Sequence, residues 1–349
     1  MNRRHFLAAA TISSATIFAD SANRSRRPMG ITMASYMIRW RNRKDKSIQP
    51  AWKDALDVLD HCQDLGAGCL QVSVRGWTSE FADDVRDKRE SLGIALEGQL
   101  GLPWADKALE KFESDVKAAK EAGATILRTT CLGQRRYEKF ETLDEWNSFV
   151  KESRAALERA EPIVAKHGMK LAFENHKDWR INETLDLLNH LGSDAIGITF
   201  DFGNNLALLE DPMEMVKALA PSIMTTHLKD MAMAEYEDGF LLSEVPLGEG
   251  ILDLSAMMKV CTDANPDIWF NLEMITRDPL KVPVFKENYW ATMPQLNAPD
   301  LVKTLKLASQ GNREILPSIA DTNLIAQIDF EESNIRQCFD YGRQKLGFS

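Results

Sequence analysis

The chain has 349 residues, of which 44% are hydrophobic and 27% are charged, a composition typical of globular proteins. Its length suits one barrel domain of roughly 250 residues with extensions, built around a single large core. The net charge of -10 and a pI of about 5.3 argue against a nucleic-acid partner, because no basic stripe follows the first 50 residues. A small molecule is the expected partner.

The first residues carry the pattern of an export signal. Arg3 and Arg4 precede an uncharged stretch from Leu7 to Ala19, and small residues follow near Ala19 to Ala22. This pattern resembles a twin-arginine signal peptide, and its apolar stretch is too short to span a membrane. We therefore expect residues 1–27 to be a signal peptide and tail. The mature protein would be periplasmic or otherwise extracytoplasmic. The alternative is a disordered basic N-terminal segment that carries no targeting signal.

From residue 31 onward, short apolar runs alternate with amphipathic stretches, a pattern typical of parallel βαβ units. Eight runs are predicted strands: Ile31–Tyr36, Cys69–Val74, Ala95–Leu100, Thr125–Cys131, Lys170–Glu174, Ile196–Asp201, Ser222–His227 and Ile268–Glu273. Helical spacing of apolar residues predicts helices that include Ala51–Leu65, Ala105–Ala122 and Thr142–His167. Glycines that favour a left-handed cap follow predicted helices at Gly66, Gly93, Gly123 and Gly168. The pattern predicts a (β/α)₈ TIM barrel over residues 28–278.

The segment after the eighth predicted strand is rich in proline and then regains helical patterning near Leu301–Ala308 and Asp329–Lys345. We assign residues 279–349 to a C-terminal extension packed on the barrel. A homo-oligomer is compatible with a soluble barrel of this kind, but no residue specifies one.

Five scattered cysteines form no zinc-binding or redox motif: Cys62, Cys69, Cys131, Cys261 and Cys338. We expect buried free thiols. A bridge between Cys62 and Cys69 is the alternative in an oxidising compartment.

Residues able to bind a metal ion stand at or near the ends of the last four predicted strands: Glu174, Asp201, His227 and Glu273. Successive members lie 27, 26 and 46 residues apart; the first two intervals match a strand-helix repeat and the third requires an extra loop. Because the C-terminal strand ends of a barrel meet at one mouth, these residues can surround one ion. A carboxylate after a buried strand is unfavourable unless it is paired or metal-bound. The alternatives are rim salt bridges, a helix cap at Asp201 and a core histidine at His227.

The motifs around these residues resemble those of one known family. The xylose-isomerase-like barrels described as sugar phosphate isomerases and epimerases are similar in Phe173-Glu174-Asn175-His176, Asp201-Phe202-Gly203-Asn204, His227-Leu228-Lys229-Asp230 and the strand-end Glu273. The similarity runs from about Ile31 to Glu273 and includes a loop resembling the family's at Pro246–Gly250. The resemblance implies one divalent ion, with Mn²⁺ expected and Mg²⁺, Co²⁺ or Zn²⁺ as alternatives, held by Glu174, Asp201, His227 and Glu273.

The resemblance also implies a chemistry. Glu174 and Glu273 occupy positions similar to the family's acid/base pair, in which one residue removes a proton next to a carbonyl and the other returns it. A divalent ion stabilises the enediolate formed between these steps, which predicts a sugar isomerase or epimerase. If a neighbouring hydroxyl or glycosidic oxygen departs instead, the enzyme is a dehydratase, lyase or hydrolase of keto-sugars or 3-keto-glycosides. A non-catalytic sugar-binding barrel is the alternative from another class.

Further residues are candidates for contact with the substrate: His176, Lys229, Glu97, Gln71, Arg277 and Trp40. Residues two apart on a strand face the same side, so His176 and Lys229 lie beside predicted ligands. Gln71 and Glu97, in the second and third predicted strands, can bind sugar hydroxyls. Arg277, past the last strand, can bind an anion, and Trp40 can stack on a sugar face. Each also has a structural alternative, such as a supporting hydrogen bond or core packing.

Two substrate classes are disfavoured. No glycine-rich turn directly follows the seventh or eighth predicted strand, and an exported enzyme seldom meets phosphorylated sugars, so an unphosphorylated sugar, keto-sugar or glycoside is expected. A nuclease of the endonuclease-IV type shares the barrel but uses a histidine-rich site with several zinc ions. This chain has six histidines in all.

Overall fold

The computed structural model describes residues 27–311 and 316–349. The predicted signal peptide, apart from its last residue, lies outside this part of the chain. Within the part described, no helix combines the length and the apolar character needed to cross a membrane.

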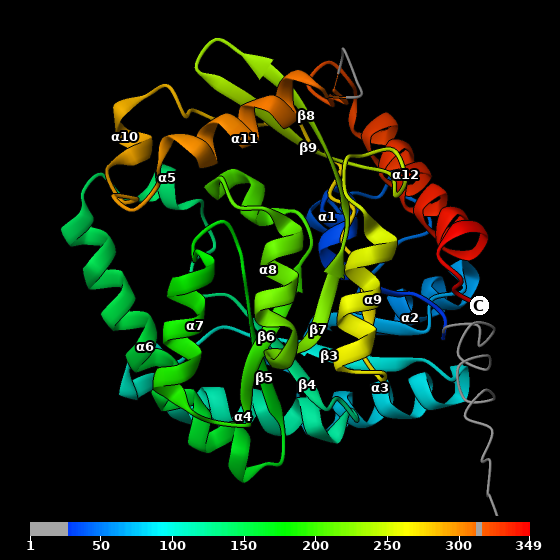
Figure 1. The fold of residues 1–349 in the computed structure, drawn as a ribbon. Coiled ribbons are helices and arrows are strands. Elements are labelled where there is room, and N and C mark those ends of the chain that lie inside the picture. The colour runs from blue at the N-terminus through cyan, green and yellow to red at the C-terminus, as the bar shows by residue number, and fades with distance from the viewer. Residues whose placement is uncertain (1–26, 312–315) are drawn as a thin grey trace, which may run out of the picture.

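Parallel strands close into a barrel in the order β1-β10-β7-β6-β5-β4-β3-β2, with helices around it (Figure 1). This confirms the predicted TIM barrel. The barrel strands are β1 (Gly30–Thr32), β2 (Cys69–Ser73), β3 (Ala95–Gln99), β4 (Ile126–Thr129), β5 (Lys170–Glu174), β6 (Ile196–Asp201), β7 (Ile223–Leu228) and β10 (Phe270–Leu272).

Helices connect the barrel strands, and the longer ones cover the outside of the barrel (Figure 1). They are α1 (Met37–Arg41), α2 (Ala55–Leu65), α3 (Ser79–Leu92), α4 (Leu109–Glu121), α5 (Arg136–Lys139), α6 (Leu143–Lys166), α7 (Ile181–Leu191), α8 (Pro212–Leu219) and α9 (Leu254–Ala264). The predicted helices are confirmed except at two starts: α2 begins at Ala55, after its Asp54 cap, and α4 begins at Leu109, after a 3-10 turn. Thr142 and Glu145 form a capping box at the start of α6. Gly66 ends α2 with a φ of 77°, the left-handed conformation that glycine tolerates best.

The first strand is shorter than predicted. The prediction of a strand over Ile31–Tyr36 is wrong beyond Thr32, because residues Met33–Tyr36 form a 3-10 helix that leads into α1. The Thr32 side chain accepts a hydrogen bond from the Ala34 backbone N–H and so caps this turn. A short apolar run does not distinguish a strand from a buried helical turn, which explains the error.

The long interval before the last barrel strand holds a hairpin where the sequence predicted only a loop. Strands β8 (Asp230–Tyr236) and β9 (Gly239–Val245) pair in antiparallel fashion, and β11 (Leu280–Val282) adds to the free edge of β9. Gly239 is required there, because a Cβ would lie 2.3 Å from the Val282 carbonyl oxygen. The segment after residue 278 therefore contributes a strand to this second sheet as well as helices.

The C-terminal extension contains α10 (Glu287–Trp290), α11 (Ala298–Ser309) and α12 (Leu324–Lys345). Helix α11 packs along the hairpin, whereas α12 adds buried Ile335 and Phe339 to the core of the barrel (Figure 1). The helices predicted near Leu301–Ala308 and Asp329–Lys345 are confirmed and are longer than predicted. All five cysteines are buried and free, as expected, and Cys62 and Cys69 form no bridge.

Candidate metal centre

Four buried side chains meet at the C-terminal mouth of the barrel, and one donor atom from each lies within 4.8 Å of the others: Glu174, Asp201, His227 and Glu273. The strand register brings them together. Asp201 on β6 lies directly opposite His227 on β7, Glu174 ends β5, and Glu273 directly follows β10. The structure thus brings together all four predicted ligands. Three carboxylates and one imidazole suit a divalent ion such as Mn²⁺, Mg²⁺ or Zn²⁺.

Hydrogen bonds fix the orientation of the His227 ring. Gln71 donates through Nε2 to Glu97 at 3.0 Å, which directs the Gln71 Oε1 acceptor to His227 Nε2 at 2.8 Å. The proton of the neutral ring therefore lies on Nε2, and the lone pair lies on Nδ1. Nδ1 is buried, has no hydrogen-bond partner of good geometry among the described residues, and lies 3.2 Å from Glu273 Oε1 and 3.4 Å from Glu174 Oε2. A lone pair facing two carboxylates fits a metal ligand.

The electrostatics favour a cation at this position. Burial lowers the pKa of His227, but Glu273 and Glu174 outweigh burial and raise it to about 9. The two carboxylates that attract a proton to Nδ1 would equally attract a metal ion there. Burial likewise opposes ionisation of the glutamates, yet Arg128 and His227 hold the pKa of Glu174 well below its usual range, and His227 and Lys229 do the same for Glu273. Both glutamates are therefore ionised at neutral pH.

Two basic side chains pair with the carboxylates. The Arg128 Nε donates to Glu174 Oε2 at 2.8 Å. The buried Lys229 ammonium lies 2.6 Å from both Asp201 Oδ2 and Glu273 Oε2. Lys229, a predicted substrate contact, therefore binds two of the predicted metal ligands in this structure.

Backbone and amide groups hold Asp201 in place. Its Oδ1 accepts hydrogen bonds from the backbone N–H groups of Gly203 and Asn204, each at 3.0 Å. The Asn175 side chain binds both the backbone N–H and the carbonyl of Asp201, at 2.7 and 2.9 Å. Burial raises the pKa of Asp201 to about 6. The alternative role of Asp201 as a helix cap is wrong, because the 3-10 helix that follows begins after Gly203 and α8 is capped by Asp211. Oδ1 binds the turn after β6, while Oδ2 is directed at the cluster.

Four polar residues of this centre were not predicted from the sequence: Arg128, Lys177, Asn204 and Glu244. Asn204 donates to Glu174 Oε1 at 3.1 Å and accepts a hydrogen bond from the buried Lys177 ammonium. Lys177 adopts a φ of 51°, in the left-handed region that non-glycine residues rarely occupy. Glu244, on β9, pairs with the Arg277 guanidinium. Arg128 could have been found from the sequence, because it is a basic residue within the apolar strand β4. The positions of Lys177, Asn204 and Glu244 depend on tertiary contacts.

The remaining predicted substrate contacts occupy different environments. His176 is mostly buried beside Glu174, its Nδ1 has no hydrogen-bond partner among the described residues, and burial lowers its pKa to about 4. Arg277 is bound by Glu244. Gln71 and Glu97 are fully buried below the mouth and bind other side chains, Glu97 accepting also from Thr225 at 2.8 Å. The hydrogen bonds of Gln71 and Glu97 orient His227. Contact of these two side chains with sugar hydroxyls stays a prediction.

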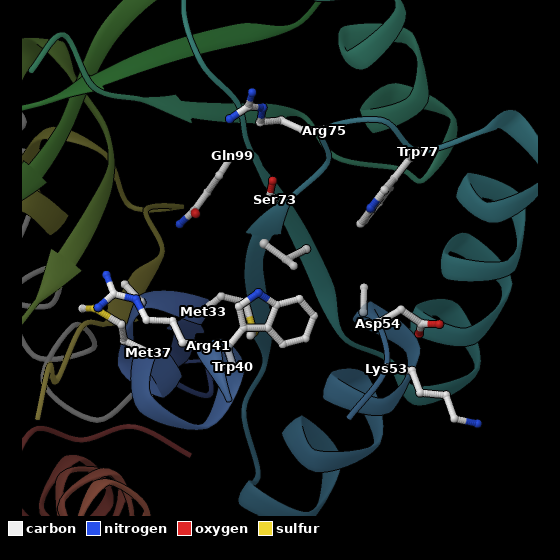
Figure 2. A pocket seen from close by; sticks show the side chains of 13 residues that line it. Met33, Met37, Trp40, Arg41, Lys53, Asp54, Ser73, Arg75, Trp77 and Gln99 are labelled. Carbon is white, nitrogen blue, oxygen red and sulfur yellow. The ribbon is translucent and has the colours of Figure 1, made fainter. Parts of the chain in front are cut away.

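Trp40 lies on α1, in a cleft of about 470 Å³ next to the ends of β1, β2 and β3 (Figure 2). Trp77, from the loop after β2, and Gln99, the last residue of β3, line the same cleft. Trp40 therefore lies beside the metal centre and not among its ligands.

Residues 100–296, more than half of the chain, match the family described as xylose isomerase-like TIM barrels. The chain belongs to this family. It is similar to the 3-oxo-isoapionate decarboxylase of Pectobacterium atrosepticum, with 27% identity over 236 residues that cover 66% of this chain and 79% of that protein.

Solved structures share the fold at low sequence identity. A D-psicose 3-epimerase, determined in the presence of D-fructose, has a TM-score of 0.59 at 12% identity, covering 92% of this chain and 99% of that chain. The IOLI protein, determined with a zinc atom, has a TM-score of 0.52 at 15% identity, covering 80% of this chain and 95% of that chain. These similarities show the fold alone.

Proposed function

We propose that this protein is a divalent-metal-dependent sugar isomerase or epimerase that removes a proton from the carbon next to a carbonyl group. The observation that carries the proposal is the position of His227 Nδ1, 3.2 Å from Glu273 Oε1 and 3.4 Å from Glu174 Oε2, in a site that also contains Asp201. A bound divalent ion, with Mn²⁺ proposed, would supply Lewis-acid polarisation of the carbonyl and stabilise the enediolate.

The positions of the two glutamates support their proposed role as a pair of proton carriers. Glu174 on β5 and Glu273 after β10 are separated in the barrel by β6 and β7, so they approach the centre from different sides. Both are ionised, which suits the first of them to accept a proton. One carboxylate then removes the proton from the substrate carbon and later releases it to solvent. The other takes a proton from solvent and gives it to the opposite face of that carbon or to the adjacent carbon, which restores both carboxylates.

A second candidate is cleavage next to the same carbonyl, as a lyase, hydrolase, dehydratase or decarboxylase of a keto-sugar. The similarity to a 3-oxo-isoapionate decarboxylase favours it. In a 3-oxo acid, the bond to the carboxylate breaks, its electron pair enters the carbonyl to give the enolate, and a protonated glutamate then protonates the carbon. His176, with an unpartnered Nδ1 next to the centre, is placed to bind a hydroxyl or a departing oxygen.

One experiment separates these reactions. The Mn²⁺-loaded protein is incubated in D₂O with aldoses, ketoses, 3-keto-glycosides and a 3-oxo sugar acid, and products are followed by NMR. Deuterium incorporation or an epimer without cleavage supports the isomerase or epimerase; release of an aglycone or of CO₂ supports the second candidate.

Variants test whether the glutamates carry the chemistry. Glu174→Gln and Glu273→Gln should each abolish turnover, whereas Glu235→Gln, on an exposed face of β8, should not. If the wild type and both variants bind sugar equally well and none turns it over, the protein is a binder and the proposal is wrong.

Export by the twin-arginine route also stays a proposal, supported only by the sequence pattern of residues 2–22. Cell fractionation of the wild type and of a variant with Arg3 and Arg4 both replaced by Lys would test it. Loss of the extracytoplasmic fraction in the variant is the expected result, and an unchanged distribution would contradict it.

A further inference from the structure

The cleft beside the metal centre is a separate compartment of the barrel mouth. Its volume of about 470 Å³ falls within the range of roughly 300–1,000 Å³ typical of small-molecule sites. None of the four predicted metal ligands lines it. A single sugar ring whose reacting carbon lies at the metal ligands would therefore leave this space unfilled.

Gln99 joins the cleft to the metal centre. Its Nε2 donates to Gln71 Oε1 at 2.7 Å and to Thr32 Oγ1 at 2.8 Å. The same Gln71 oxygen accepts the hydrogen bond from His227. The cleft thus begins two hydrogen bonds away from a predicted metal ligand, through the Gln71 side chain.

The walls of the cleft suit a ring that carries hydroxyl groups. Trp40 and Trp77 are both partly exposed, and aromatic faces stack on the apolar faces of sugars and on aromatic rings. Arg41 and Arg75 are exposed and form no ion pair or hydrogen bond with other described residues, so their guanidinium groups are free to donate to a ligand. Figure 2 shows Arg41, Arg75 and Gln99 on the side of the cleft nearer the barrel strands, with Trp77 on the opposite side.

We propose that this cleft binds the second ring of a two-ring substrate, the aglycone or second sugar of a keto-glycoside, while the keto-sugar ring lies at the metal centre. The inference rests on the proposed function for the position of the reacting ring. It implies that glycosides are better substrates than free monosaccharides.

The test compares two probes, 3-ketoglucose and its phenyl β-glycoside. Trp77→Ala and Trp40→Ala should lower the ratio of kcat/KM for the phenyl glycoside to kcat/KM for the free sugar by about tenfold, the effect of losing one stacking contact. Trp269→Ala is the matched control, because Trp269 precedes β10 at the opposite end of the barrel and contacts Arg27. An unchanged ratio in both cleft variants would overturn the proposal.

Binding measurements separate failure of this inference from failure of the proposed function. Calorimetry with the metal-loaded protein measures the affinity for each probe independently of turnover. If the wild type turns over neither probe, but the cleft variants lose affinity for the phenyl glycoside selectively, the proposed function is wrong and the cleft assignment stands. If the wild type turns over 3-ketoglucose and neither affinity nor ratio depends on the cleft tryptophans, the cleft assignment alone is wrong.

Discussion

Gln71 accepts a hydrogen bond from His227 Nε2 at 2.8 Å. The other ring nitrogen, Nδ1, faces the carboxylates of Glu174 and Glu273. Gln71 is itself oriented by Glu97, whose Oε2 also accepts from Asn271 at 2.9 Å. A chain of buried side chains therefore decides which nitrogen of His227 presents its lone pair to an ion. Such supporting contacts adjust the affinity of a metal site without touching the ion.

Replacing Gln71 should weaken metal binding. Gln71→Leu removes the acceptor for His227 Nε2, so the ring loses its fixed tautomer, and the affinity for Mn²⁺ should fall roughly 10- to 100-fold. Calorimetric titration of the metal-free protein measures this. Gln99→Leu is the matched control, because it removes a neighbouring hydrogen bond but leaves Gln71 on His227, and its effect should be smaller. Equal affinities in Gln71→Leu and the wild type would show that the hydrogen bond does not matter.

Lys229→Met should destabilise the metal-free protein. Lys229 lies 2.6 Å from two buried carboxylates, and breaking a buried pair by removing one partner costs roughly 3–5 kcal/mol of unfolding free energy. Saturating metal should reduce that loss, since the ion supplies positive charge to the same carboxylates. Urea unfolding with and without Mn²⁺ measures both values. Lys286→Met, which breaks an exposed pair with Asp238, should change the unfolding free energy far less, because solvent screens that pair. Similar losses in the two variants would show that Lys229 does not form a buried ion pair with these carboxylates.

Glu244 should make stability depend on pH. Burial opposes its ionisation, but Arg277 and Lys229 outweigh burial and lower its pKa from 4.5 to about 2. A carboxylate with a lowered folded-state pKa stabilises the fold fully above the unfolded pKa, and this stabilisation is lost as the pH falls from 4.5 toward 2. The wild type should therefore lose up to about 3 kcal/mol relative to Glu244→Gln across that window. Urea unfolding at pH 7, 5, 4 and 3 measures the difference, and parallel curves for the two proteins would contradict the expectation.

The metal ligands could be found from sequence because the barrel repeats. Each strand-end acid or histidine follows an apolar run, and parallel strands carry such positions to one mouth. The hairpin β8–β9 could not be found in this way, because it breaks the strand-helix alternation in the 46-residue interval before Glu273. Met33–Tyr36 was misassigned because a buried helical turn and a strand have the same apolar composition over so few residues.

The partners of the ligands were harder to predict than the ligands. Lys177 reaches the centre through Asn204, and Glu244 reaches Arg277 through the hairpin, so both depend on contacts between distant segments. No period in the sequence encodes such pairs. Trp40 was predicted as a candidate substrate contact, while its place in a separate cleft depends on the position of α1 and could not be predicted.

The most direct test of the metal centre is a crystal structure of the protein grown with Mn²⁺, with anomalous diffraction data collected at the manganese edge. The account predicts one anomalous peak at the barrel mouth, ligated by Glu174, Asp201, Glu273 and the Nδ1 atom of His227. A peak bound by other residues, or no peak at a saturating concentration of Mn²⁺, would contradict it.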